Sequence, residues 1–201
     1  MNKHPKKMQF WFEFASTYSY LSIMRIEKFI SDTNIELEWC PFLLGPIIKN
    51  FGWTTSPFNI YKEKGKHMWR DIERHCEKYN IPFKKPSVFP RNGLLAARVA
   101  IIGLKDNWGK EFAKKAFLAN FSEDRDIQDP AVLGEILSSL QVNSEKIITL
   151  ANTVDNQNSL RQLTDTAMDK GIFGAPTFIV DGELFWGNDR LEDAIEFANR
   201  S

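Results

Sequence analysis

The sequence predicts an α/β fold in which one sheet is assembled from both ends of the chain, with a helical segment between them. Residues 9–40 follow the order strand, helix, strand, and residues 177–186 have the pattern of two strands joined by a tight turn. Residues 45–171 show helical periods and turn breaks, but almost no alternation of apolar and polar residues. The strands at the front and the back must therefore pair within one sheet.

The front of the chain has a β-α-β pattern. Residues 9–15 (QFWFEFA) are almost continuously apolar, as in a strand buried on both faces. Ser16 or Thr17 then caps a helix whose apolar residues recur at helical spacing up to residue 30. Apolar and polar residues alternate from 35 to 40 (IELEWC), which predicts the second strand. Residue 16 thus lies where a strand ends and a helix begins.

The middle of the chain is predicted to be helical, with two irregular loops. Residues 52–59 (GWTTSPFN) are rich in turn formers, and residues 81–92 (IPFKKPSVFPRN) contain three prolines, which an interior helix does not tolerate. Asp129 before Pro130 is a specific helix start, a capping residue followed by proline in the first turn. The predicted helices cover residues 67–79, 94–104, 108–121, 131–140, 145–151 and 160–170.

The end of the chain returns to the sheet. Short apolar runs flank Asp181 and Gly182, a pair typical of a tight hairpin. Asn188 or Asp189 then caps a last helix with one apolar face. We therefore expect a discontinuous sheet domain, residues 1–44 and 172–201, and a helical insertion domain, residues 45–171.

Composition excludes several classes of function. The 26 Lys and Arg balance the 26 Asp and Glu, so the whole chain offers no electrostatic reason to bind nucleic acid or an anionic membrane. No stretch approaches the roughly 20 apolar residues of a membrane span, and the N-terminal residues lack the apolar run of a signal peptide. Cys40 and Cys76 form no C-x-x-C pair, and with three histidines they predict no metal site. We expect a cytoplasmic protein.

Two short motifs carry possible chemistry. Ser16 is predicted at a helix N-terminus, where unpaired N–H groups and the helix dipole favour an anion. By itself, a serine at that position is more often an N-cap than a catalyst. The second motif is Gly174-Ala175-Pro176-Thr177 before a strand. X-Pro bonds are cis in only about 5–6% of cases in folded proteins, so the dipeptide alone does not predict a cis bond.

Together these features resemble the thioredoxin-like fold of the DsbA group. Oxidoreductases of that group have C-x-x-C where this chain has STYS at 16–19, and two hydroxyls do not support dithiol exchange. The chain is more similar to the 2-hydroxychromene-2-carboxylate isomerases and kappa-class glutathione transferases, which have a serine there. The resemblance rests on FEFASTYSYL (12–21), GIFGAPTF (171–178) and LFWGNDRLED (184–193), and the element order matches over essentially the whole chain.

The resemblance implies a thioredoxin-like (DsbA/kappa-type) domain with a large all-helical insertion, and an enzyme that borrows its thiol from glutathione. It implies that Ser16 donates a hydrogen bond to the glutathione sulfur and favours the thiolate. Ala175, before a cis Pro176, would pair its backbone with the cysteinyl part. Thr17 departs from the family pattern, which usually has proline there. The γ-glutamyl end would lie at Asn188, Asp189, Arg190 and Leu191.

The resemblance also implies a second, small-molecule substrate, an aromatic or conjugated carbonyl compound bound between the two lobes. Lys49 and Asn59 align with a lysine and an asparagine that contact substrate in the isomerases. Phe89 aligns with an aromatic residue of the proline-rich loop, which is residues 81–92 in this chain. As an alternative, Lys49 is a solvated helix charge. Trp53 belongs to an aromatic group that suits a planar substrate, although aromatics at helical spacing are more often core. His67 and His75 are interpreted as exposed helix residues.

We therefore expect a homodimeric glutathione-dependent isomerase that acts through the thiolate of bound glutathione, with Ser16 as its catalytic residue. One alternative is a kappa-type glutathione transferase or peroxidase that forms conjugates. Others are a DsbA-like thiol-disulfide oxidoreductase acting through Cys40 and Cys76, and a non-catalytic module that binds extended peptides beside Pro176.

Overall fold

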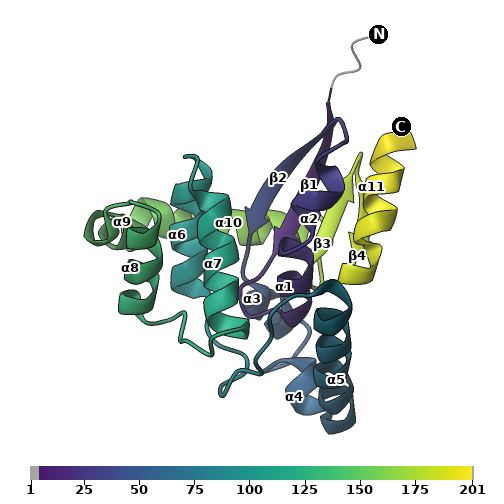
Figure 1. Ribbon diagram of the computed structural model, residues 1–201, viewed down its shortest axis with the longest axis horizontal. Coiled ribbons are helices and arrows are strands. Elements are labelled where there is room, and N and C mark those ends of the chain that lie inside the picture. Colours follow the sequence, from purple (N-terminus) through teal and green to yellow (C-terminus); the bar gives the residue numbers. More distant parts are fainter. Residues whose placement is uncertain (1–4, 201) are drawn as a thin grey trace.

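One mixed sheet forms the centre of the molecule (Figure 1). The computed structural model describes residues 5–200, so residues 1–4 and 201 of the predicted sheet domain lie outside it. The strand order is β2-β1-β3-β4, with β1 parallel to β2 and antiparallel to β3, and β3 antiparallel to β4. The predicted α/β class and the sheet built from both chain ends are confirmed. The strands are β1 (Lys6–Phe12), β2 (Ile35–Pro41), β3 (Thr177–Val180) and β4 (Glu183–Trp186).

Helices surround this sheet. Figure 1 shows α6 to α9 gathered beyond the β2 edge and α11 beside β3 and β4, while α4 and α5 lie near the start of α1. The helices are α1 (Thr17–Ile23), α2 (Ile26–Ile30), α3 (Leu44–Asn50), α4 (Pro57–Ile60), α5 (Lys62–Tyr79), α6 (Leu94–Leu104), α7 (Gly109–Phe121), α8 (Pro130–Ser139), α9 (Ser144–Ala151), α10 (Val154–Asp169), the short 3-10 helix η1 (Asn188–Arg190) and α11 (Leu191–Arg200).

The two faces of the sheet bury separate apolar clusters, because successive residues of a strand point to opposite faces. Phe10 and Phe12 of β1 lie in the larger cluster, where Phe12 lies against Phe14 and Phe117. Trp11 points the other way and packs with Phe42 in a smaller cluster that includes residues of α3 and α10. Both faces of β1 are buried, as its continuous apolarity predicts.

The first strand and the first helix differ from the sequence expectation at their ends. The strand ends at Phe12 and not at residue 15, because the next residues form a tight turn: Ser16 N–H donates to the Glu13 carbonyl at 3.0 Å. The predicted helix up to residue 30 is two helices, separated at Arg25. Arg25 is buried and its guanidinium binds Asn188, so the break joins the front of the chain to its end. The predicted cap at Asp129 with Pro130 in the first turn is confirmed.

Candidate functional site

One end of the sheet opens into a cleft of about 1360 Å³. The chain segments that meet there are the turn after β1, the residues after β2, the residues before β3 and those after β4, and all of them line the cleft. The opposite wall comes from α3 to α5 and from the proline-rich loop. The topology therefore brings the two motifs found in the sequence, around residues 16 and 175, to one site.

Ser16 occupies the start of α1 and faces this cleft. Its Oγ accepts a hydrogen bond from Ser19 N–H at 3.1 Å, as an N-cap does. The same hydroxyl donates to the Ala175 carbonyl oxygen at 2.9 Å. Ser16 is therefore an N-cap, and its hydroxyl also joins the start of the helix to a segment 159 residues away in the chain. Only one hydrogen is available, so a ligand that takes this hydrogen bond must replace Ala175 as the acceptor.

Ala175 and Pro176 form the edge of the cleft beside Ser16. The Ala175-Pro176 peptide bond is cis, as the resemblance implies. Pro176 is anchored through its carbonyl, which accepts from Gly187 N–H at 3.0 Å. Within residues 5–200 the Ala175 N–H donates to no acceptor, so this residue offers an extended peptide both a donor and an acceptor.

The residues after β4 differ in orientation. Asn188 is only 3% exposed, and its Oδ1 accepts from Ser22 Oγ at 3.1 Å and from Arg25, so its side chain is committed to the interior. Leu191 is buried in the core, whereas Asp189 and Arg190 are exposed at the cleft. Gly187 has φ +114°, and a Cβ there would collide with the Asp189 carboxylate. The glycine thus lets the chain turn tightly enough to present that carboxylate.

Of the four residues predicted to contact the substrate, only two line the cleft. Trp53 and Phe89 line the cleft, and Phe89 packs edge-on against Trp69, with ring centroids 4.8 Å apart. Asn59 lies outside the residues that line it, but its Nδ2 donates to the Phe89 carbonyl at 3.3 Å. Lys49 is exposed on α3 and is not among the lining residues. The structure therefore brings two of these side chains to the cleft, connects a third to it indirectly, and leaves Lys49 outside.

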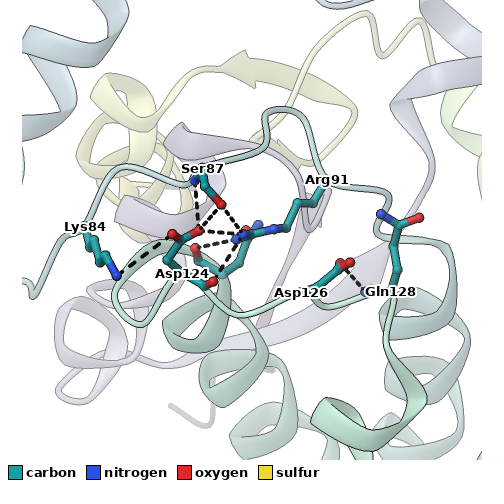
Figure 2. Close-up of polar contacts among 7 residues, drawn as sticks. Lys84, Ser87, Arg91, Asp124, Asp126 and Gln128 are labelled. Carbon is teal, nitrogen blue, oxygen red and sulfur yellow. Dashed lines mark hydrogen bonds and ion pairs between the residues drawn. The ribbon is translucent and has the colours of Figure 1, made fainter.

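A charged network centred on the buried Arg91 fixes the proline-rich loop that carries Phe89 (Figure 2). The Arg91 guanidinium, almost fully buried, binds Asp124 and donates to Ser87 Oγ at 3.2 Å. It also donates to the backbone oxygen and to Oδ1 of Asn120, and Asn120 Nδ2 donates to the Phe14 carbonyl at 3.2 Å. The hydrogen bonds of Ser87 and Arg91 lower the pKa of Asp124 to about 2. These hydrogen bonds thus connect the proline-rich loop, α7 and the turn before Ser16 to one another.

Replacing Arg91 by methionine is expected to lower the melting temperature. The change leaves two acceptors on buried Asn120 without their donor, which costs at least about 2 kcal/mol, or roughly 4–8 °C for a chain of this size. Thermal unfolding by circular dichroism measures the shift. Arg70→Met is the matched control, because Arg70 forms an exposed pair with Glu73, and that pair contributes little. Equal shifts in the two variants would contradict the structural role of Arg91.

Glu13 is a site residue that the sequence analysis did not single out. Its carboxylate Oε2 accepts from Ala15 N–H at 3.0 Å, and its side chain lines the cleft although the residue is only 9% exposed. Burial raises the pKa of this carboxyl from 4.5 to about 7, and the hydrogen bond from Ala15 opposes part of that shift. The sequence feature that could have identified Glu13 is that it is the single acidic residue in the apolar run QFWFEFA.

A second set of site residues that the sequence analysis did not identify joins α1 to α5. The Tyr18 hydroxyl donates to Asp71 Oδ2 at 2.9 Å, and His75 Nε2 lies 3.7 Å from Asp71 Oδ1. Burial, and then the hydrogen bond to Asp71, raise the pKa of Tyr18. His75 is half-buried, which corrects the expectation of an exposed histidine, whereas His67 is exposed, and both line the cleft. The packing of α5 against α1, which the helical period alone does not reveal, explains this difference.

The two cysteines are free, buried and located in different clusters, Cys40 in the smaller one and Cys76 in the larger. Burial raises the pKa of Cys76 to about 12, and it raises the pKa of Cys40 as well. Neither residue lines the cleft. The protein's own thiols therefore remain protonated and away from Ser16.

Comparison with known proteins identifies the fold family. The model of the DSBA-like thioredoxin domain matches residues 7–196. The chain belongs to this family. The family's thioredoxin-like fold agrees with the expectation from the sequence. Within residues 5–200, no helix is both long enough and apolar enough to span a bilayer.

The chain is similar to the 2-hydroxychromene-2-carboxylate isomerase of Sphingobium xenophagum, at 27% identity over 188 residues, 93% of this chain and 95% of that protein. It is 26% identical to glutathione S-transferase kappa 2 of Caenorhabditis elegans, over 96% of this chain and 91% of that one. A solved 2-hydroxychromene-2-carboxylate isomerase superposes with a TM-score of 0.88 at 20% identity, covering 96% of this chain and 95% of that one. The relatives named here are enzymes that act on small molecules.

Proposed function

We propose that the protein is a glutathione-dependent isomerase of a conjugated carbonyl or aromatic substrate. The observation that carries this proposal is the Ser16 hydroxyl, which faces the cleft from a helix N-terminus beside Ala175, while both cysteines are buried elsewhere. A site without its own reactive thiol, in this fold, is suited to a thiol brought by a ligand. The names of the isomerase and transferase relatives support the same interpretation.

The residues present fit glutathione. The free N–H and the carbonyl of Ala175 suit the backbone of its cysteinyl residue. When a ligand N–H bonds to the Ala175 carbonyl, the Ser16 hydrogen is free to turn toward the sulfur. Exposed Asp189 and Arg190 suit the amino and carboxylate groups of the γ-glutamyl end, which carry opposite charges. The side chains of Asn188 and Leu191 are committed to the interior, so their predicted contribution would come from the backbone.

Glutathione held there would supply a thiolate, a nucleophile suited to reversible addition to a conjugated double bond. Ser16 holds the negative sulfur through a charge-assisted hydrogen bond. Trp53, Phe58 and Phe89 form an apolar wall for a planar substrate and limit the access of water to the reacting atoms. The predicted roles of Lys49 and Asn59 stay predictions, as do the homodimer, the cytoplasmic location and the division into two domains.

Glutathione stoichiometry separates the isomerase from the transferase, which the kappa-class relative keeps as the second candidate. An isomerase regenerates glutathione, so we expect many turnovers for each glutathione molecule, measured by chromatography of substrate, product and thiol. Consumption in proportion to turnover would establish the transferase instead. The double variant Cys40→Ala, Cys76→Ala is expected to retain activity, and its inactivity with an intact fold would favour the dithiol oxidoreductase.

A further inference from the structure

Glu13 places a carboxyl group inside the cleft, in the turn that leads to Ser16. Its Oε2 binds the N–H of Ala15, and its carbonyl oxygen accepts from Ser16 N–H at 3.0 Å. The backbone N–H of Glu13 lies 3.4 Å from Ser19 Oγ, which accepts it. The acid is thus held rigidly within the segment that presents the Ser16 hydroxyl.

The second carboxylate oxygen, Oε1, has no hydrogen-bond donor within residues 5–200. The backbone of Gly93 packs close to it, and a Cβ on Gly93 would lie 3.0 Å from Oε1. Arg91, two residues before Gly93, is committed to Asp124 and Asn120. None of the charged or titratable groups facing the cleft from α1, α5 and η1 pairs with Glu13 in the described structure; these are Tyr18, Lys64, His67, Asp71, His75, Asp189 and Arg190.

The hydrogen bond that Glu13 makes within the turn does not require an ionisable side chain. Glutamine could accept the Ala15 hydrogen bond equally well, without a charge that is costly to bury. A buried carboxylate that lacks a cation is stabilised by taking up a proton. Its raised pKa of about 7 places this uptake near neutral pH, where proton acceptors work most efficiently.

We propose that Glu13 accepts the thiol proton of glutathione bound at Ser16, an assignment that rests on the proposed function. The S–H bond breaks, its electron pair stays on sulfur, and the proton forms an O–H bond on Glu13, directly or through one water. One negative charge leaves the carboxylate as one appears on the sulfur, so the net charge of the buried site is unchanged. The proton returns to the sulfur when glutathione leaves as the free thiol, which closes the cycle.

Proton counting tests this assignment. At pH 7.5 Glu13 is mostly ionised and a free thiol, with a pKa of about 8.5, is mostly protonated. Calorimetric binding of glutathione in two buffers of different ionisation enthalpy gives the protons released, and ultraviolet absorbance gives the thiolate formed. In the wild type we expect fewer than about half a proton released per thiolate, because Glu13 keeps it. In Glu13→Gln, thiolate formation must release close to one proton per thiolate.

The control is Glu38→Gln, which removes an exposed carboxylate of β2 bonded to Gln9, outside the cleft, and is expected to match the wild type. One proton released per thiolate in the wild type overturns the role of Glu13, whether or not the glutamine variant folds. Thiolate formation without release in Glu13→Gln overturns it as well. Absence of glutathione binding heat in the wild type is a separate result that refutes the proposed function, and this assignment with it.

Discussion

Replacing Ser16 by alanine is expected to lower glutathione-dependent turnover about 100-fold, in the range found when one donor to a developing anion is removed. The hydroxyl is the side-chain donor at the start of α1 in the cleft, and its present acceptor, the Ala175 carbonyl, can be taken over by a ligand N–H. The bound thiol should also ionise at higher pH, which the ultraviolet absorbance of the thiolate measures. Binding should weaken less than turnover, because the backbone of Ala175 and the side chains of Asp189 and Arg190 remain.

Loss of the N-cap is the competing explanation for this result, since Ser16→Ala removes a cap worth about 1 kcal/mol. Thr153→Ala is the matched control. Thr153 caps α10 by accepting from Asn156 N–H, and it does not line the cleft. We expect similar losses of stability in the two variants and full activity in the control. Unchanged turnover and unchanged thiol ionisation in Ser16→Ala would contradict the role given to the hydroxyl.

Replacing Glu13 by glutamine is expected to stabilise the protein, by an amount that grows as the pH rises from 4.5 to about 7 and is constant above that. Below pH 4.5 the wild-type carboxyl is protonated in both the folded and the unfolded state and costs nothing. Between pH 4.5 and about 7 the unfolded chain releases the proton while the folded chain retains it, so wild-type stability falls as pH rises. Above pH 7 the loss is complete, at about 3 kcal/mol for a shift of this size.

Urea unfolding at pH 4.5, 6 and 8 measures this dependence. The stability difference between Glu13→Gln and the wild type should be close to zero at pH 4.5 and largest at pH 8. Glu38→Gln, an exposed acid in a surface hydrogen bond, should show no such trend. A difference that is the same at all three pH values would mean that the glutamine changes packing, and that the Glu13 carboxyl is not held protonated by burial.

Much of the fold follows from local signals in the sequence. The apolar run before Ser16, the Asp181-Gly182 turn and the cap at Asp129 predict elements that the structure contains, because each depends on residues close together in the chain. The pairing of the front strands with the back strands also follows, since short strands must join a sheet.

The side chains of the site are less predictable, because their roles depend on packing between distant segments. Glu13 lies only three residues before Ser16, yet its carboxylate packs close to the backbone of Gly93, which is 80 residues away in the chain. The half-buried state of His75 depends on α5 packing against α1. Lys49 lies outside the cleft because α3 presents Leu44 and Ile48 to it instead. Periodicity identifies a helix and its apolar face, but not which neighbour covers it.

We propose that the cleft uses the thiol of a ligand held between Ser16 and Ala175. A crystal structure of the protein with bound glutathione tests this proposal most directly. We predict the glutathione sulfur within hydrogen-bonding distance of Ser16 Oγ, with the cysteinyl backbone paired to the N–H and the carbonyl of Ala175. Glutathione bound with its sulfur away from Ser16, or a cleft that stays free of glutathione at saturating concentration, would contradict the claim.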